Sequence, residues 1–260
     1  MEIRIYQVDA FANKTFEGNP AAVCPLDTWL PNELLQQIAE ENNLSETAFF
    51  VAENESFALR WFTPEEEVDL CGHATLASAH VLFHHLGYSK ESISFYTKSG
   101  ILKVKRAESG YSMSFPASLP EPTKIPHELA VGLGIKPKLT LAAFDYIVVL
   151  ENEAQVQAIT PDLSMLQKLD LRGVVITALG DEVDFVSRCF FPSLSVNEDP
   201  VTGSAHCELA PYWSKQLGKN QLIGQQLSKR TGLVKCKVID DKVILEGNAV
   251  DYMSGIIRIN

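Results

Sequence analysis

The sequence lacks the cysteine pattern of a disulfide framework or a zinc ribbon. Its five cysteines are odd in number, and no two of them form a C-x-x-C pair. Such usage is typical of proteins kept in a reducing compartment. We therefore expect a cytoplasmic protein with free thiols.

Long hydrophobic runs and excess positive charge are also missing. No apolar stretch approaches the roughly 20 residues that span a membrane, and the opening MEIRIYQVDAF alternates like a strand and does not resemble a signal peptide. The 22 Lys and Arg residues face 33 Asp and Glu, for a net charge of −11. This balance argues against nucleic acid and anionic membranes as partners. An anionic substrate would have to be held locally, for example at helix N-termini.

Several cofactor and catalytic motifs are absent as well. The chain has no phosphate loop, no G-x-G-x-x-G and no G-x-S-x-G elbow. What is present is a chain of 260 residues, 46% of them hydrophobic, which suffices for one large or two ordinary globular domains.

A proline-rich segment, FPASLPEPTKIPHE, is the best candidate for a linker. It divides the chain into domains 1–118 and 119–260. Before it, hydrophobic periodicity predicts strands at 3–10, 45–51, 57–62, 92–97, 101–106 and 111–115, with helices at 34–41 and 72–86. After it we expect helices at 126–134, 162–169 and 203–217, and strands at 144–150, 173–179, 183–190, 234–239, 242–246 and 254–259.

The two halves share a sequence repeat. An R-x-F-x-P motif at 60–64 recurs at 188–192, an offset of 128 positions, and the G-x-A of 72–74 recurs at 203–205, an offset of 131. Each half thus has two strands, a loop and an apolar helix in the same order. Chance similarity between two α/β segments is the alternative, but several matches at nearly constant offset favour a duplicated fold.

Where the repeat breaks, each half contributes different polar residues. The opposed pairs are Cys71 with Thr202, His73 with Ser204, Glu46 with Ile176, and Val68 with Asp199. Complementary polar residues on two related halves predict a single active site in a cleft between them.

Two glycines, Gly72 and Gly203, each open an apolar helix. Free amides at such helix starts, which include those of Ala74 and Ala205, favour an anion. The alternative is that each glycine only permits a tight turn. Because the feature is duplicated, we favour binding of a substrate carboxylate.

The polar candidates each have a structural alternative. Glu46, among the apolar residues of LSETAFF, suits a general acid or base, or it is an exposed strand-end residue. His73 could transfer protons or cap its helix. Asp199, before a proline, could be part of a turn, and the Ser204 hydroxyl could satisfy a helix amide.

Cysteine and histidine offer two further interpretations. Cys71 beside a helix start could be a reactive thiolate. A metal site would combine Cys71, His73, His206 and Cys207, but their spacing does not match that of zinc sites, and His80, His84 and His85 are also scattered. We therefore predict no metal site.

The segments VDAFANKTFEGNPAAVC, LSETAFF, LRWFTPEEEVDLCGHATLASAH and EDPVTGSAH resemble the phenazine-biosynthesis PhzF-like family. The resemblance runs from the first strand to the last. It implies an α+β, diaminopimelate-epimerase-like fold of two similar domains, each a β-barrel-like sheet around a central helix, with a last strand able to return to the first domain. It also implies a homodimer.

In that family the glutamate of S-E-T, here Glu46, is the general acid/base. The resemblance places His73, Asp199 and Ser204 around the substrate and implies cofactor-free isomerisation of a dihydro-hydroxyanthranilate. Related racemases use two cysteines, whereas here Thr202 stands opposite Cys71.

Three hypotheses follow for the function. The first is an isomerase of a small carboxylate in which Glu46 shuttles the proton, assisted by His73 and Asp199. The second is an amino-acid racemase or epimerase that works with Cys71. The third is a non-catalytic protein that binds a small molecule.

Overall fold

The structure is a computed structural model that describes all 260 residues. It divides into two compact units, the first made of Met1–Ser114 and Glu246–Asn260 and the second of Phe115–Leu245. The last fifteen residues belong to the first unit because the final strand pairs with the opening strand, from Glu2 opposite Arg258 onward. The second unit accordingly ends at Leu245, and the last strand of the expected domain 119–260 lies with the first unit.

Most strands of the first unit come from the part of the sequence before the chain passes to the second unit. Its strands are β1 (Glu2–Ala10), β2 (Asn19–Leu26), β3 (Glu46–Glu53), β4 (Ser56–Phe62), β5 (Glu67–Val68), β6 (Ser92–Thr97), β7 (Gly100–Arg106) and β18 (Ala249–Arg258). The chain passes to the second unit within β8 (Tyr111–Pro116) and returns within β17 (Lys242–Gly247). Two helices, α1 (Asn32–Asn42) and α2 (Gly72–His84), complete the unit.

The strand order of the first unit is set by a series of direct pairings. β1 lies between β2 and β18 and is antiparallel to both. β2 runs parallel to β3, β3 is antiparallel to β4, and β4 pairs with β5 in antiparallel and with β6 in parallel fashion. β6, β7 and β8 then form an antiparallel meander.

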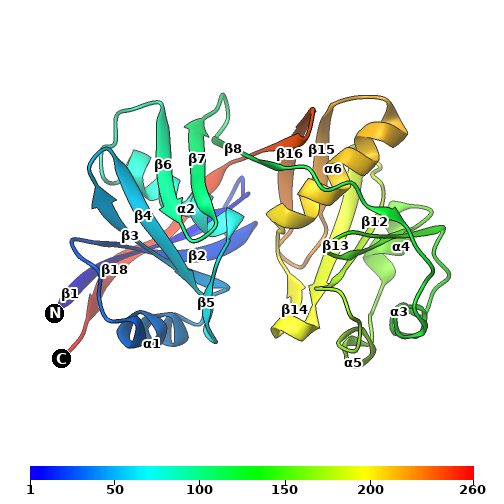
Figure 1. Cartoon of the computed structure of the whole chain (residues 1–260), viewed down its shortest axis with the longest axis horizontal. Coiled ribbons are helices and arrows are strands. Elements are labelled where there is room, and N and C mark those ends of the chain that lie inside the picture. The colour runs from blue at the N-terminus through cyan, green and yellow to red at the C-terminus, as the bar shows by residue number, and fades with distance from the viewer. The chain divides into compact units, whose positions relative to one another are not determined.

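Helix α2 is the centre of this unit and contacts β1, β2, β3, β7 and β18 (Figure 1). Its sequence, GHATLASAHVLFH, has no Asp, Glu, Lys or Arg and is apolar or small on all sides. A helix of this kind is stable only when it is surrounded by protein. All eleven residues from His73 to Phe83 are accordingly buried.

The amphipathic helix α1 covers the outer side of the sheet instead. Leu35, Ile38 and Ala39 are its buried residues. They pack with Ile3 and Phe49 of the strands in one hydrophobic cluster. This packing fixes the position of the segment that leads from α1 into β3.

The second unit has its own strands and helices. Its strands are β9 (Glu121–Pro122), β10 (Leu139–Ala142), β11 (Tyr146–Val149), β12 (Val174–Leu179), β13 (Phe185–Phe191), β14 (Val196–Asp199), β15 (Gln221–Gln226) and β16 (Gly232–Ile239). Its helices are α3 (His127–Leu133), α4 (Glu153–Ala158), α5 (Leu163–Leu166), the 3-10 turn Pro192–Leu194 and α6 (Gly203–Leu217).

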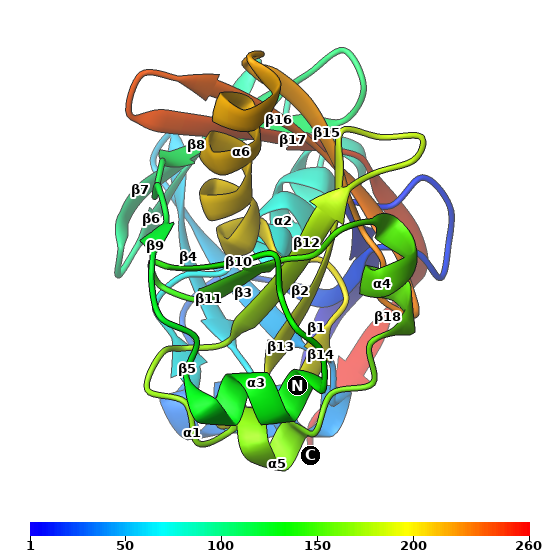
Figure 2. The ribbon, with the colours of Figure 1, turned by 90° about the vertical axis from the view of Figure 1, so that its right-hand side faces the viewer.

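The pairings of the second unit repeat those of the first. β11 runs parallel to β12, β12 is antiparallel to β13, and β13 pairs with β14 in antiparallel and with β15 in parallel fashion. Helix α6, buried over most of its length, contacts β15 and β16 and takes the place of α2 (Figure 2). The structure therefore agrees with the duplicated fold that the sequence repeat predicts.

No helix in either unit has the length and apolar character needed to cross a membrane.

Candidate active site

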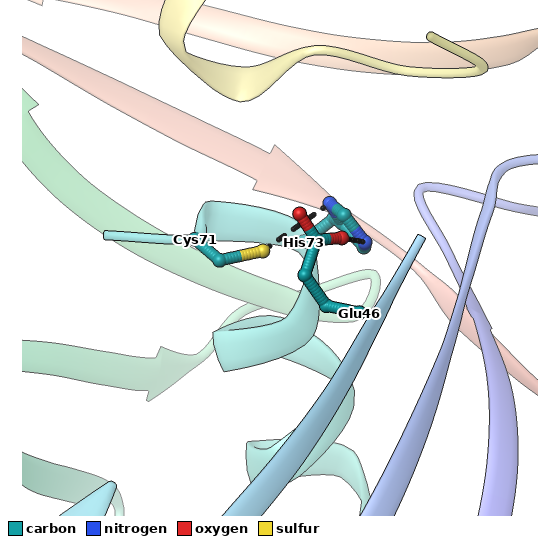
Figure 3. A group of neighbouring side chains, drawn as sticks. All are labelled: Glu46, Cys71 and His73. Atoms are coloured by element: carbon teal, nitrogen blue, oxygen red, sulfur yellow. Dashed lines mark hydrogen bonds and ion pairs between the residues drawn. The ribbon is translucent and has the colours of Figure 1, made fainter. Parts of the chain in front are cut away.

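Three side chains meet at the N-terminal end of α2 (Figure 3). The Nε2 atom of His73 lies 2.9 Å from Oε2 of Glu46, and its Nδ1 atom lies 3.5 Å from the Sγ atom of Cys71. His73 and Cys71 are buried and Glu46 is half-buried. The facing atoms Oε2 of Glu46 and Nε2 of His73 are both buried, and neither has a partner that meets hydrogen-bond geometry. These two atoms thus lie against each other, and neither forms a hydrogen bond with the rest of the protein.

The backbone explains why these residues converge. Helix α1 ends at Asn42, and the left-handed conformation of the next residue, Asn43 (φ 48°), turns the chain so that β3 begins at Glu46. Cys71 is extended (φ −145°) and precedes the first turn of α2, with no side chain capping that turn. Because β3 packs against α2, the strand start and the helix start bring Glu46 to His73.

The charges of the group act on the imidazole. Burial works to lower the pKa of His73, but the negative charges that Cys71 and Glu46 can carry outweigh it and hold that pKa well above its usual value. Burial, followed by the charge of Glu46, raises the pKa of the Cys71 thiol. Negative charge on either neighbour thus favours the protonated ring of His73, and the Cys71 thiol keeps its proton to a higher pH than a free cysteine does.

Asp199, the last residue of β14, lies in a second polar network at the start of α6. Its Oδ2 atom accepts a hydrogen bond of 2.5 Å from the Thr202 hydroxyl, and its carbonyl oxygen accepts one of 2.6 Å from Nε2 of Gln226. The buried Gln226 in turn accepts from the Thr202 amide at 2.8 Å. This network fixes the loop between β14 and α6.

Ser204, in the first turn of α6, accepts a hydrogen bond from an arginine. Nη2 of Arg172 lies 3.0 Å from the serine Oγ atom, and the same guanidinium forms a bidentate pair with the buried Asp145 at 2.9 and 2.5 Å. A hydroxyl that accepts from a cation keeps its own proton free to be donated. Ser204 is therefore held ready as a donor.

The two helix starts have the same local geometry. Cys71 and Thr202 both precede their helices with extended backbones, and neither helix has a side-chain cap. In the first helix, which opens at Gly72, the Ala74 amide faces the Cys71 thiol, a weak acceptor that an anion can displace. The amides from Gly203 to Ala205 have no capping side chain.

The structure places every predicted site residue at one of these two helix starts, with Glu46, His73 and Cys71 in the first unit and Asp199 and Ser204 in the second. It adds Arg172, Asp145 and Gln226. No local pattern marks Arg172 or Gln226, because their hydrogen-bond partners come from segments distant in the chain. A buried charged residue within an apolar run, such as the aspartate in LAAFDYIVV, is the one signal that could have identified Asp145.

The potential metal ligands at these sites are divided between the two units. The ligand atoms of Glu46, Cys71 and His73 lie within 4.8 Å of one another. In the second unit, Nδ1 of His206 lies 2.8 Å from the carbonyl oxygen of Thr202, and burial raises the pKa of the Cys207 thiol to about 12. A metal ion there would have to displace the thiol proton of Cys207 and the contact of His206 with that carbonyl oxygen.

Comparisons with a family model, with related sequences and with solved structures point to the same family. Residues 8–255 match the family described as Phenazine biosynthesis-like protein. An uncharacterized isomerase of Pseudomonas aeruginosa is 52% identical over 259 residues, covering 100% of both chains. A crystal structure of a PhzF family phenazine biosynthesis protein from Enterococcus faecalis is 50% identical, with a TM-score of 0.97 and 100% of both chains covered.

A more distant likeness concerns the fold alone. A hydroxyproline epimerase from Agrobacterium vitis has a TM-score of 0.60 at 8% identity, covering 98% of this chain and 92% of that chain. The predicted α+β, epimerase-like fold is therefore confirmed.

Proposed function

Because the chain belongs to the phenazine biosynthesis-like family and is an isomerase, we propose that it moves a proton within a small carboxylate substrate without a cofactor, using Glu46 as the acid/base. The observation that carries the proposal is the Glu46 carboxylate, whose buried Oε2 atom lies 2.9 Å from Nε2 of His73 and forms no further hydrogen bond. A carboxylate whose neighbour is itself an acid/base side chain can take a proton from substrate.

The proposed reaction balances without a redox partner. Glu46 removes a proton from a substrate C–H, and the electron pair of that bond stays on the substrate and shifts a neighbouring double bond. The protonated Glu46 then returns the proton to another carbon. Atoms and oxidation level are unchanged, so a substrate with a C–H next to an unsaturated group is sufficient.

His73 supports this cycle electrostatically. The protonated ring of His73 donates toward negative charge that develops on the substrate. The amides of Gly72 and Ala74 are suited to the substrate carboxylate. Asp199, Ser204 and the amides of Gly203 and Ala205 are proposed to bind the same substrate, as the family resemblance implies.

The second candidate is a racemase that uses Cys71. The 3.5 Å contact of its Sγ atom with the His73 ring favours it, because a base beside a thiol can generate a thiolate. Two observations oppose it. Burial raises the pKa of Cys71, and the Thr202 hydroxyl, at the position of a second thiol, already donates to Asp199.

The test is deuterium incorporation in D2O, followed by NMR on a panel of aromatic and aliphatic carboxylates that carry an activated C–H. The wild-type chain is expected to exchange a C–H of at least one substrate. Glu46→Gln, which keeps the side-chain shape, is expected to slow that exchange by about 100-fold or more.

The matched control is Glu53→Gln at the exposed far end of the same strand, which is expected to exchange at the wild-type rate. Circular dichroism and thermal unfolding check that both variants fold. Exchange by folded Glu46→Gln at the wild-type rate would exclude Glu46 as the acid/base, and loss of exchange on alkylation of Cys71 alone would favour the racemase.

A further inference from the structure

A second cluster of polar side chains lies at the opposite, C-terminal end of α2. Nε2 of His80 and Nε2 of His85 both face Oδ1 of Asp251, at 3.2 and 2.8 Å. His80 is in the last turns of the helix, His85 follows its end, and Asp251 comes from β18. The three residues belong to one unit although 166 positions separate His85 from Asp251.

The spacing of these atoms is close to that required by a tetrahedral metal ion. Zinc binds histidine nitrogen and carboxylate oxygen at about 2.0–2.2 Å, so tetrahedral ligand atoms are about 3.4 Å apart. The three ligand atoms here lie within 4.8 Å of one another. To admit an ion, the contacts of 3.2 and 2.8 Å with Asp251 would open by about 0.2 and 0.6 Å, and the two histidine nitrogens, which lie within 4.8 Å of each other, would settle about 3.4 Å apart.

The surroundings of His80 fit the role of a metal ligand. Its Nδ1 atom lies 3.0 Å from the hydroxyl of Tyr111. That hydroxyl can donate to Nδ1 while Nε2 carries the proton, or accept from Nδ1 when Nε2 binds a metal. The ring can therefore change tautomer without moving, and an outer partner of this kind orients metal-bound histidines.

The cluster is also accessible from one side. His80 is buried, whereas 47% of the Asp251 side chain and 29% of the His85 side chain are exposed. Tyr6 packs against the His85 ring with centroids 4.6 Å apart and restrains it. An ion could enter from solvent, and water could occupy the fourth position.

We propose that His80, His85 and Asp251 form a binding site for a divalent transition-metal ion, of which zinc is the best match. Two imidazoles and one carboxylate are a ligand set that zinc accepts. The ion would join the end of the central helix to β18, the strand that closes the first unit. The site is separate from Glu46, Cys71 and His73, which lie at the other end of α2.

The test is isothermal titration of the chelator-treated full chain with Zn²⁺. We expect about one ion per chain, with a dissociation constant of about 10 µM or tighter. Asp251→Asn and His85→Gln should each weaken binding by at least about tenfold, and Tyr111→Phe should weaken it by a similar factor through His80.

Two controls separate this site from its neighbours. His84→Gln removes an exposed histidine that stacks on His80 but does not face Asp251, and Cys71→Ser disables the other potential ligand group. Both variants should bind Zn²⁺ like the wild-type chain. The proposal is overturned if the wild-type chain does not bind Zn²⁺, if Asp251→Asn binds it with unchanged affinity, or if Cys71→Ser abolishes binding.

Discussion

The Thr202 hydroxyl donates a hydrogen bond of 2.5 Å to the carboxylate of Asp199. Thr202 occupies the position in the second unit that Cys71 occupies in the first, directly before the central helix. A hydroxyl engaged in this way cannot serve as the second acid of a two-thiol racemase. The contact therefore argues against a racemase that pairs Cys71 with residue 202. It also stabilises the loop between β14 and α6.

Replacing Cys71 by serine should leave proton exchange within about threefold of the wild-type rate. The reason is that burial raises the pKa of this thiol, with a further contribution from the charge of Glu46, so little reactive thiolate exists at neutral pH. The measurement is deuterium incorporation by both proteins with the same substrate. A loss as large as that expected for Glu46→Gln would instead identify Cys71 as a catalytic residue.

Removing the charge of Glu46 should lower the pKa of His73. Burial opposes protonation of this ring, and the charges of Cys71 and Glu46 reverse that effect. Because a carboxylate within about 4–6 Å shifts a pKa by about one to three units, Glu46→Gln should lower the His73 value by at least about one unit in an NMR titration. His206, whose pKa is lowered to about 4 by burial, is the internal control and should not change.

Arg188→Lys should destabilise the protein more than Arg60→Lys does. Each arginine forms a bidentate pair, Arg188 with Glu198 at 2.7 and 3.0 Å and Arg60 with Glu67 at 2.8 Å twice. Arg188 also donates to the carbonyl oxygen of Ile159 at 2.7 Å, just beyond α4. Glu67, in contrast, keeps a second partner in Lys98 at 2.9 Å.

We expect a loss of about 2–4 kcal/mol for Arg188→Lys and about half of that for Arg60→Lys. Urea denaturation of the two variants under the same conditions measures both. Equal losses would mean that the contact with Ile159 counts for no more than the hydrogen bond of 2.9 Å that Arg60 donates to Oδ1 of Asn32.

The same arginines explain why the R-x-F-x-P repeat was visible in the sequence. Residues two apart in a strand lie on one face, so Arg60 stacks over Phe62 at 5.1 Å and Arg188 over Phe190 at 5.0 Å. The repeated motif records a repeated packing arrangement. The apolar helices were also predictable, and the helix at 203–217 has the predicted bounds.

Elements that depend on distant partners were not predicted. The strands β14 (VNED) and β15 (QLIGQQ) are short or polar, and neither range is among the expected strands. Their pairing with β13 stabilises them as strands. Short polar segments have no strong preference of their own, and tertiary contacts decide their structure.

The site was predictable to the same limited extent. Glu46 and His73 are in conspicuous motifs, and their meeting follows from packing of β3 on α2. Gln226 and Arg172 act through hydrogen bonds between segments far apart in the chain. No local pattern encodes such contacts.

Glu208 should make the protein less stable as the pH rises. This residue of α6 is fully buried, and neither carboxylate oxygen has a hydrogen bond of good geometry, although the backbone amides of Phe144 and Asp145 lie near them. Burial, followed by the charge of Asp145, raises its pKa from 4.5 to about 8 although Arg172 acts in the other direction. Between those two values the folded chain keeps a proton that the unfolded chain releases. The free energy of unfolding must therefore fall across this range and level off above about pH 8.

The Glu208→Gln variant isolates this contribution, because an amide does not titrate. Each unit of pKa shift corresponds to about 1.4 kcal/mol, and we expect the wild-type chain to lose about 2–4 kcal/mol more than the variant between about pH 5 and 8.5. Urea denaturation at both pH values gives the difference, with Glu182→Gln, at an exposed position, as the control that should follow the wild-type chain. If Glu208→Gln and the wild-type chain lose the same stability over this range, then Glu208 is ionised in the folded protein, and its carboxylate must have partners in solution that offset the cost of its burial.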